Sequence, residues 1–116
     1  MARVLFADSE PHIQRLFQEE LEDEGYEVAV AGDAGEVVRL MDIFHPDVVI
    51  LEVLLPGMSG LETARIIKGT RRSTMVILFS NFVPPRNLPA LGADAYVRKS
   101  SDINGLKETV RRLLLA

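Results

Sequence analysis

Short, continuous runs of hydrophobic residues alternate along the chain with longer segments whose hydrophobic positions recur at helical spacing. The runs lie at residues 3–7, 26–31, 47–55, 75–80 and 95–98. Runs of this length, hydrophobic at successive positions, are typical of strands that are buried on both faces. We therefore predict strands of a parallel sheet that is covered by helices on both sides.

Helix signals separate these runs, because each run but the fourth is followed by proline or a capping residue and then by hydrophobic residues three or four positions apart. The first helix is expected to end at Gly25 and the second at Pro46. The residues that mark the predicted helix starts are Pro11, Asp33, Ser59 and Asp102.

The segment at 81–94 breaks this regularity, since it carries Pro84, Pro85 and Pro89. Proline removes a backbone donor and clashes with the preceding helical turn, so about one helical turn at most fits here. We predict that the helix between the fourth and fifth strands is short, irregular or absent. The prediction for the whole chain is an α/β fold, a (βα)5 doubly wound parallel sheet in one domain at residues 1–116.

Composition narrows the classes of function. The chain has no cysteine, which excludes disulfides and thiolate metal sites. Its net charge of −4 provides no attraction to nucleic acid or anionic lipid, so we expect this domain to bind neither nucleic acid nor membrane. The first hydrophobic run ends at Asp8 and is too short for a signal peptide or a membrane span, which predicts a cytoplasmic protein.

Polar residues follow the predicted strands at the end where sheets of this kind place their sites. In open parallel sheets, ligands bind outside the carboxyl ends of the strands, where the strand order reverses. For the order 2-1-3-4-5, that crevice lies between the first and third strands. The polar residues at these strand ends are Asp8, Ser9, Glu52, Ser80 and Lys99. Two acids, two hydroxyls and one lysine at one edge predict a functional site.

The same residues lie in segments that resemble the receiver domain of response regulators, such as the chemotaxis regulators. Residues 5–11 (LFADSEP) resemble the receiver opening, and residues 46–60 (PDVVILEVLLPGMSG) resemble the phosphoacceptor strand and its following turn. Residues 92–99 (GADAYVRK) resemble the final strand with its lysine, and Ser80 falls where the family keeps Ser or Thr. The resemblance covers nearly the whole chain. It implies a flavodoxin-like fold with strand order 2-1-3-4-5 and a role in two-component (phosphorelay) signal transduction.

In this family a histidine kinase transfers a phosphoryl group to an aspartate with the help of Mg²⁺, and the chain departs from that pattern at the centre of the site. Glu52 occupies the phosphoacceptor position, and Ser9 occupies the second acidic position, which in the family ligates the metal. Ser100 replaces the proline that usually follows the lysine, so the cis bond found there loses its proline. Glutamate places its carboxylate about 1.5 Å further out, and misplacement by about 1 Å costs such a transfer roughly a hundredfold.

These departures predict an atypical pseudo-receiver that is a binding module and not an enzyme, with Lys99 neutralising Asp8 and Glu52. A neutral serine is a poor ligand for Mg²⁺, so we expect at most weak Mg²⁺ binding, at Asp8 and Glu52, and no other cofactor. One alternative is a receiver that still accepts a phosphoryl group with weak Mg²⁺ dependence. Another is a flavodoxin-like domain that binds a small molecule, although the first strand–helix turn is acidic and has no glycine-rich phosphate cradle.

Two further expectations concern switching and partners. The resemblance makes Ser80 and Tyr96 switch positions, with Tyr96 near a face built from the fourth helix, the fifth strand and the last helix. Family members often dimerise or meet partners on that face, so we expect a protein partner, an attached output domain or a homodimer there. For Ser9 the alternative role is to cap the first helix.

Overall fold

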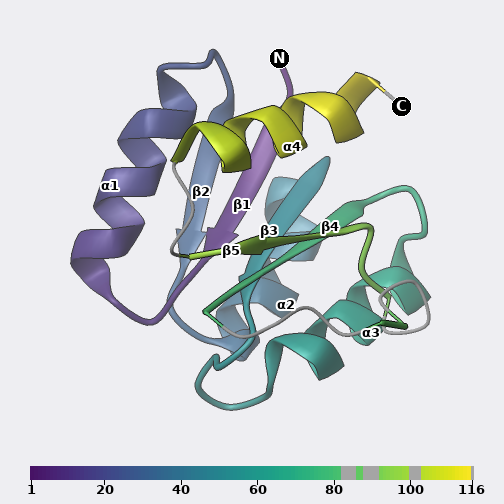
Figure 1. Cartoon of the computed structure of the whole chain (residues 1–116). Helices are drawn as coiled ribbons and strands as arrows, with labels where there is room; N and C mark the ends of the chain where they lie inside the picture. The colour runs from purple at the N-terminus through teal and green to yellow at the C-terminus, as the bar shows by residue number, and fades with distance from the viewer. Residues whose placement is uncertain (82–85, 88–91, 100–102, 116) are drawn as a thin grey trace.

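The computed structural model describes residues 1–81, 86–87, 92–99 and 103–115, and a parallel five-stranded sheet runs through its centre (Figure 1). The strand order is β2-β1-β3-β4-β5, with every neighbouring pair parallel. The strands are β1 (Arg3–Ala7), β2 (Glu27–Ala31), β3 (Val48–Glu52), β4 (Met75–Ser80) and β5 (Ala95–Arg98). The predicted fold class and strand order are therefore confirmed.

Two layers of helices cover the sheet. The helices are α1 (Pro11–Glu22), α2 (Ala34–Phe44), α3 (Gly60–Thr70) and α4 (Ile103–Leu115). Figure 1 shows α1 and α4 on one side of the sheet and α2 and α3 on the other. Successive residues of each strand point to opposite sides. In β1, Leu5 packs into the core beneath α2 and α3, whereas Phe6 packs into the core beneath α1 and α4.

Side-chain caps begin two of the helices, as the capping patterns predict. Asp33 Oδ1 accepts a hydrogen bond of 2.8 Å from the backbone amide of Glu36 at the start of α2. Ser59 Oγ accepts one of 3.2 Å from the amide of Glu62 at the start of α3. Each bond satisfies an amide that the first helical turn leaves without an intrahelical partner.

The start of α1 is built differently. Pro11 occupies the first turn, where its missing N–H and restricted φ cost nothing, and Glu10 precedes it without a side-chain cap bond. The alternative role of Ser9 as the helix cap is therefore wrong. Its side chain is directed elsewhere, toward the carboxyl end of β3.

The third strand is shorter than predicted. The hydrophobic run at 47–55 indicated one long strand, but β3 ends at Glu52 and the next residues form a turn. Leu55 is 6% exposed and packs beneath α2 and α3, whereas Leu54 is 64% exposed. A turn that packs against the core also contains hydrophobic residues. The hydrophobic run alone therefore did not show where the pairing of β3 with its neighbouring strands ends.

Some predictions fall outside the described residues. The irregular fourth helix was predicted for a segment in which only residues 81, 86–87 and 92–94 are described, and these contain no helix. Ser100 and the predicted cap Asp102 also lie outside the described part of the chain. Among the helices that are described, none is long and apolar enough to cross a membrane.

Candidate functional site: an acid–lysine cluster at the carboxyl edge of the sheet

The parallel sheet brings the predicted site residues to one edge. Asp8 directly follows β1, and the pairing of β1 with β3 places it beside Glu52, the last residue of β3. Ser80 ends β4, and Lys99 directly follows β5. The amide of Lys99 donates a 2.9 Å hydrogen bond to the carbonyl of Ser80, which holds Lys99 beside Ser80 at the carboxyl edge of the sheet.

Lys99 joins the two acids. Its Nζ lies 2.5 Å from Glu52 Oε1 and 3.0 Å from Asp8 Oδ2. We call Asp8, Glu52 and Lys99 the acid–lysine cluster. Burial alone would lower the pKa of Lys99, but the contacts and charges of Glu52 and Asp8 outweigh burial and raise that pKa above its ordinary value of 10.5. The lysine is therefore charged at neutral pH and offsets one of the two carboxylates.

Asp8 is the most buried member of the cluster. Its side chain is fully buried, and Oδ1 accepts a 3.0 Å hydrogen bond from the amide of Glu10. Among the described residues, Oδ2 has no hydrogen-bond donor in good alignment, although the ammonium of Lys99 is close. The attraction between the ammonium and Oδ2 at 3.0 Å does not require alignment, because it acts between opposite charges. The buried oxygen thus depends on the positive charge of Lys99.

Ser9 contacts the second oxygen of Glu52. Its backbone amide lies 3.2 Å from Glu52 Oε2 and its Oγ lies 3.5 Å from the same atom, both as donors. Oε1 of Glu52 is bound by Lys99 and Oε2 by Ser9, so both oxygens of this carboxylate are engaged.

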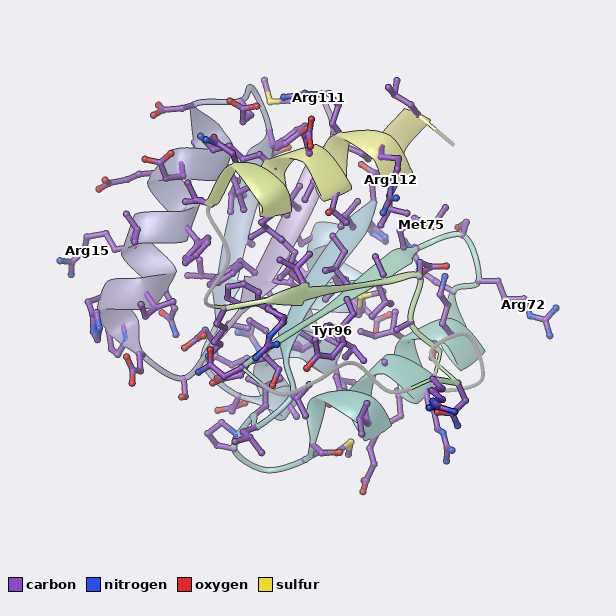
Figure 2. The ribbon with its side chains drawn as sticks, in the orientation of Figure 1. Arg15, Arg72, Met75, Tyr96, Arg111 and Arg112 are labelled. Carbon is purple, nitrogen blue, oxygen red and sulfur yellow. The ribbon has the colours of Figure 1, made fainter. Side chains whose placement is uncertain are left out.

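The two predicted switch residues lie in different surroundings. Ser80 is 3% exposed and lies at a small cavity of about 70 Å³. The cavity is lined by Glu52, Leu54, Ser80, Asn81 and Lys99. Tyr96 is half-buried on β5 and packs against the core beneath α2 and α3, and Figure 2 shows its side chain on the α3 side of the strand. The structure thus groups Ser80 with the acid–lysine cluster and places Tyr96 in the adjacent core.

The turn after β3 folds back over Glu52 and requires glycine at its end. The amide of Gly60 donates a 2.7 Å hydrogen bond to the carbonyl of Val53. A Cβ at Gly60 would fall against the carbonyl oxygen of Glu52 and 2.9 Å from the Cα of Val53. Only a residue without a side chain admits this approach, so Gly60 helps to place the strand end that carries Glu52.

Sequence reasoning did not single out Gly60, Gln14 or Asn81. Gln14 Nε2 donates a 2.6 Å hydrogen bond to the backbone carbonyl of Asp8. Asn81 lines the cavity, and its backbone carbonyl accepts a 3.1 Å hydrogen bond from Arg98 Nη2. The glycine lay in the quoted turn pattern, which could have indicated a close backbone approach. No sequence signal pointed to the other two residues.

The resemblance implies Mg²⁺ at this edge, with Asp8 and Glu52 as the available carboxylate ligands. Within the described residues, no group of three or more His, Cys, Asp or Glu side chains is placed to hold a metal ion. The buried Oδ2 of Asp8 would suit a cation, but the ammonium of Lys99 already lies 3.0 Å from it. Mg²⁺ requires near-octahedral oxygen ligation at about 2.0–2.1 Å, which a neutral serine and a lysine-bound carboxylate do not provide. These residues, as arranged, do not fit a resident Mg²⁺.

The sheet is parallel with the order β2-β1-β3-β4-β5, and it carries acids after β1 and on β3 and a lysine after β5. This combination defines the class of receiver-type α/β signalling domains. The match to known families agrees with this class. Residues 4–111 match the family model described as "Response regulator receiver domain", so the chain belongs to that family. It is a receiver domain of the kind found in two-component response regulators.

Curated relatives are longer regulators. The chain is 30% identical over 114 residues to the DNA-binding response regulator MtrA of Mycolicibacterium smegmatis, covering 97% of this chain and 50% of that protein. It is 37% identical over 107 residues to the transcriptional regulatory protein PdtaR of Mycobacterium tuberculosis, covering 90% and 52%. The chain therefore spans about half the length of the curated relatives it matches.

Solved structures give the same family. The response regulator protein TrrA of Thermotoga maritima, in complex with Mg²⁺-BeF, is 38% identical with a TM-score of 0.89, covering 97% of this chain and 99% of that chain. A second structure contains TrrA in complex with the histidine kinase ThkA and matches at 38% identity with a TM-score of 0.88, covering 98% and 99%.

Proposed function

We propose that this receiver domain signals by binding a protein partner or an attached output domain, without accepting a phosphoryl group at Glu52. The observation that carries the proposal is the engagement of both oxygens of Glu52, by Lys99 on one side and by Ser9 on the other. Phosphoryl transfer depends on an attacking oxygen that is free and in line. A longer side chain whose two oxygens are both bound satisfies neither condition.

The charge of the cluster supports the same proposal. Asp8 and Glu52 contribute two negative charges and Lys99 one positive charge, so the cluster carries a net charge of about −1. A further carboxylate at position 9 would increase the demand for a divalent cation, but Ser9 is neutral. We infer that Mg²⁺ binds this edge weakly and that the domain acts as a binding module and not as an enzyme.

The test is an amide NMR titration with Mg²⁺ and then with beryllium fluoride, a mimic of an acyl phosphate. Wild type is compared with the Ser9→Asp/Glu52→Asp variant, which restores the family's residues on the same scaffold. We expect millimolar Mg²⁺ to leave the wild-type amides around Asp8, Ser80 and Lys99 unmoved. The double variant is expected to respond to both ligands at these positions.

Two controls make the titration decisive. Ser9→Asn/Glu52→Gln changes the same two positions without adding carboxylates. Its amide resonances are expected not to shift when Mg²⁺ or beryllium fluoride is added. Incubation with acetyl phosphate, followed by intact-mass measurement, reports covalent transfer directly. Saturable wild-type binding of beryllium fluoride, or a gain of one phosphoryl mass in wild type, would contradict the proposal and favour the receiver that still accepts phosphate.

The kind of partner follows from the relatives. TrrA is seen with a histidine kinase, and the curated regulators are about twice as long as the matched segment. Both observations support a protein partner or an attached output domain for this receiver.

A further inference from the structure

The side of the sheet covered by α2 and α3 carries a hydrophobic groove between the two helices. The groove has a volume of about 50 Å³ and is lined by Val38, Met41, Asp42, Ile66, Ile67 and Thr70. Val38 of α2 and Ile66 of α3 are each 39% exposed. Burying such side chains against another surface would be favourable, and neither contributes to the acid–lysine cluster.

Charge is divided between the two ends of α3 on this face. Glu62 lies in the first turn of α3, whereas α2 carries both signs along its length, with Glu36, Arg39 and Asp42. At the other end, Arg71 and Arg72 follow α3, and Arg71 Nη2 lies 2.5 Å from Nδ1 of His45, which ends α2. That contact shows that the two helices end side by side. Figure 2 shows the side chain of Arg72 extending away from the domain. Along α3 the charges therefore run from Glu62 at the helix start to Arg71 and Arg72 after its end, with Arg65 and the hydrophobic Ile66 between them.

We propose that the α2–α3 face binds a second copy of this chain, with the helices of the two copies antiparallel and a two-fold axis crossing the groove near Ile66. In this arrangement each acidic end meets the basic end of the other copy, so Glu62 of one copy faces Arg72 of the second copy, twice in the dimer. A two-fold interface requires one patch that is complementary to itself, and this charge pattern meets that requirement. Gly69 is exposed, with open space where a Cβ would stand, which allows two α3 helices to approach closely.

This surface differs from the one that the resemblance suggested for a homodimer. That expected face is built from the fourth helix, β5 and the last helix, and much of the segment predicted for the fourth helix lies outside the described residues. The residues that form the α2–α3 face all lie in the described part of the chain.

The first test measures the dissociation constant of the dimer by sedimentation equilibrium in low and physiological salt. Glu62→Lys and Arg72→Glu should each weaken the dimer about tenfold, because each places like charges together at both contacts. The double variant Glu62→Lys/Arg72→Glu should restore the wild-type constant. An equimolar mixture of the two single variants should also restore it, because only the mixed dimer pairs opposite charges at both contacts.

Controls separate this surface from others. Arg15→Glu and Glu19→Lys reverse exposed charges on α1, on the other side of the sheet, and should leave the constant unchanged. Ile66→Asp should abolish the dimer while circular dichroism shows a folded chain. Wild type that stays monomeric at about millimolar concentration would overturn the proposal. So would a dimer that survives Ile66→Asp, or single variants that the mixture does not rescue.

Discussion

Lys99 is the residue on which the site depends most, because it serves two carboxylates at once. Asp8 is fully buried, and the side chain of Glu52 is 14% exposed, so neither can obtain full solvation in place of the lysine. Removing one partner of a buried ion pair leaves an uncompensated charge, which costs more than the pair itself contributes. Lys99 therefore has a structural role in the folded state, whatever its role in signalling.

The substitution Lys99→Met keeps most of the side-chain volume and removes the charge. We expect it to lower the free energy of unfolding at neutral pH by about 3 kcal/mol, measured by urea denaturation. Asp8→Asn/Lys99→Met should recover part of this loss, because the fully buried acid is then neutral. A loss below about 0.5 kcal/mol would show that water or a shift of Glu52 replaces the lysine.

The same variant has a defined pH dependence. The pKa of Lys99 is raised above 10.5 in the folded state, so its stabilising effect is complete below that pH and is lost as the pH rises through the folded-state pKa. The difference in stability between wild type and Lys99→Met should be constant from neutral pH to about pH 10 and should then shrink. A difference that stays constant into strong alkali would mean that charge is not its cause.

At the scale of elements, α3 is positioned by the way its first residue meets the end of β3. Alanine usually replaces glycine in a helix with a gain of up to about 1 kcal/mol. At Gly60 the added Cβ would meet the backbone of Glu52 and Val53, which cannot move aside as a flexible side chain can. The local preference of the helix and the packing of the turn therefore oppose each other at this position.

We expect Gly60→Ala to destabilise the domain by about 2 kcal/mol, in spite of the higher helix propensity of alanine. Gly105→Ala is the matched control, because Gly105 lies in the first turn of α4 with nothing within 4 Å of the added Cβ. The control should be neutral or slightly stabilising. Thermal and urea denaturation of both variants check the sign, and equal effects would refute the role of the close approach.

At the scale of the whole molecule, one sheet separates two cores. Leu78 belongs to the core beneath α2 and α3, whereas Leu21 and Val110 belong to the core beneath α1 and α4. The central strands contribute alternate residues to both cores, so loss of packing on one side should weaken pairing on the other. We expect the domain to unfold as one cooperative unit.

Native-state hydrogen exchange can test this cooperativity. Leu78→Ala should cost about 2–5 kcal/mol, and the most protected amides of α1 and α4, near Leu21 and Val110, should lose the same free energy as those of β3. Ile43→Ala removes a side chain that is 62% exposed and should change protection by less than about 0.5 kcal/mol. Loss confined to the α2–α3 side would show that the two layers open separately.

Much of the fold could be predicted from sequence because its signals are local. Hydrophobic runs predicted the strands, and the capping signals at Asp33 and Ser59 predicted the starts of α2 and α3. The position of Asp8 at a strand end followed from the same patterns. The end of β3 was misplaced, because Leu55 is hydrophobic for its packing in a turn and not for strand pairing.

The sequence by itself determined the order of elements, the parallel sheet and the edge at which polar residues gather, since each follows from periodicity within a few positions. Only the tertiary structure decided that Ser9 contacts Glu52 and does not cap the first helix, and which oxygen of each acid Lys99 and Ser9 contact. These contacts join residues 43 and 47 positions apart, through strands that meet only in the folded sheet. The need for glycine at Gly60 has the same origin, because the backbone it approaches belongs to another element.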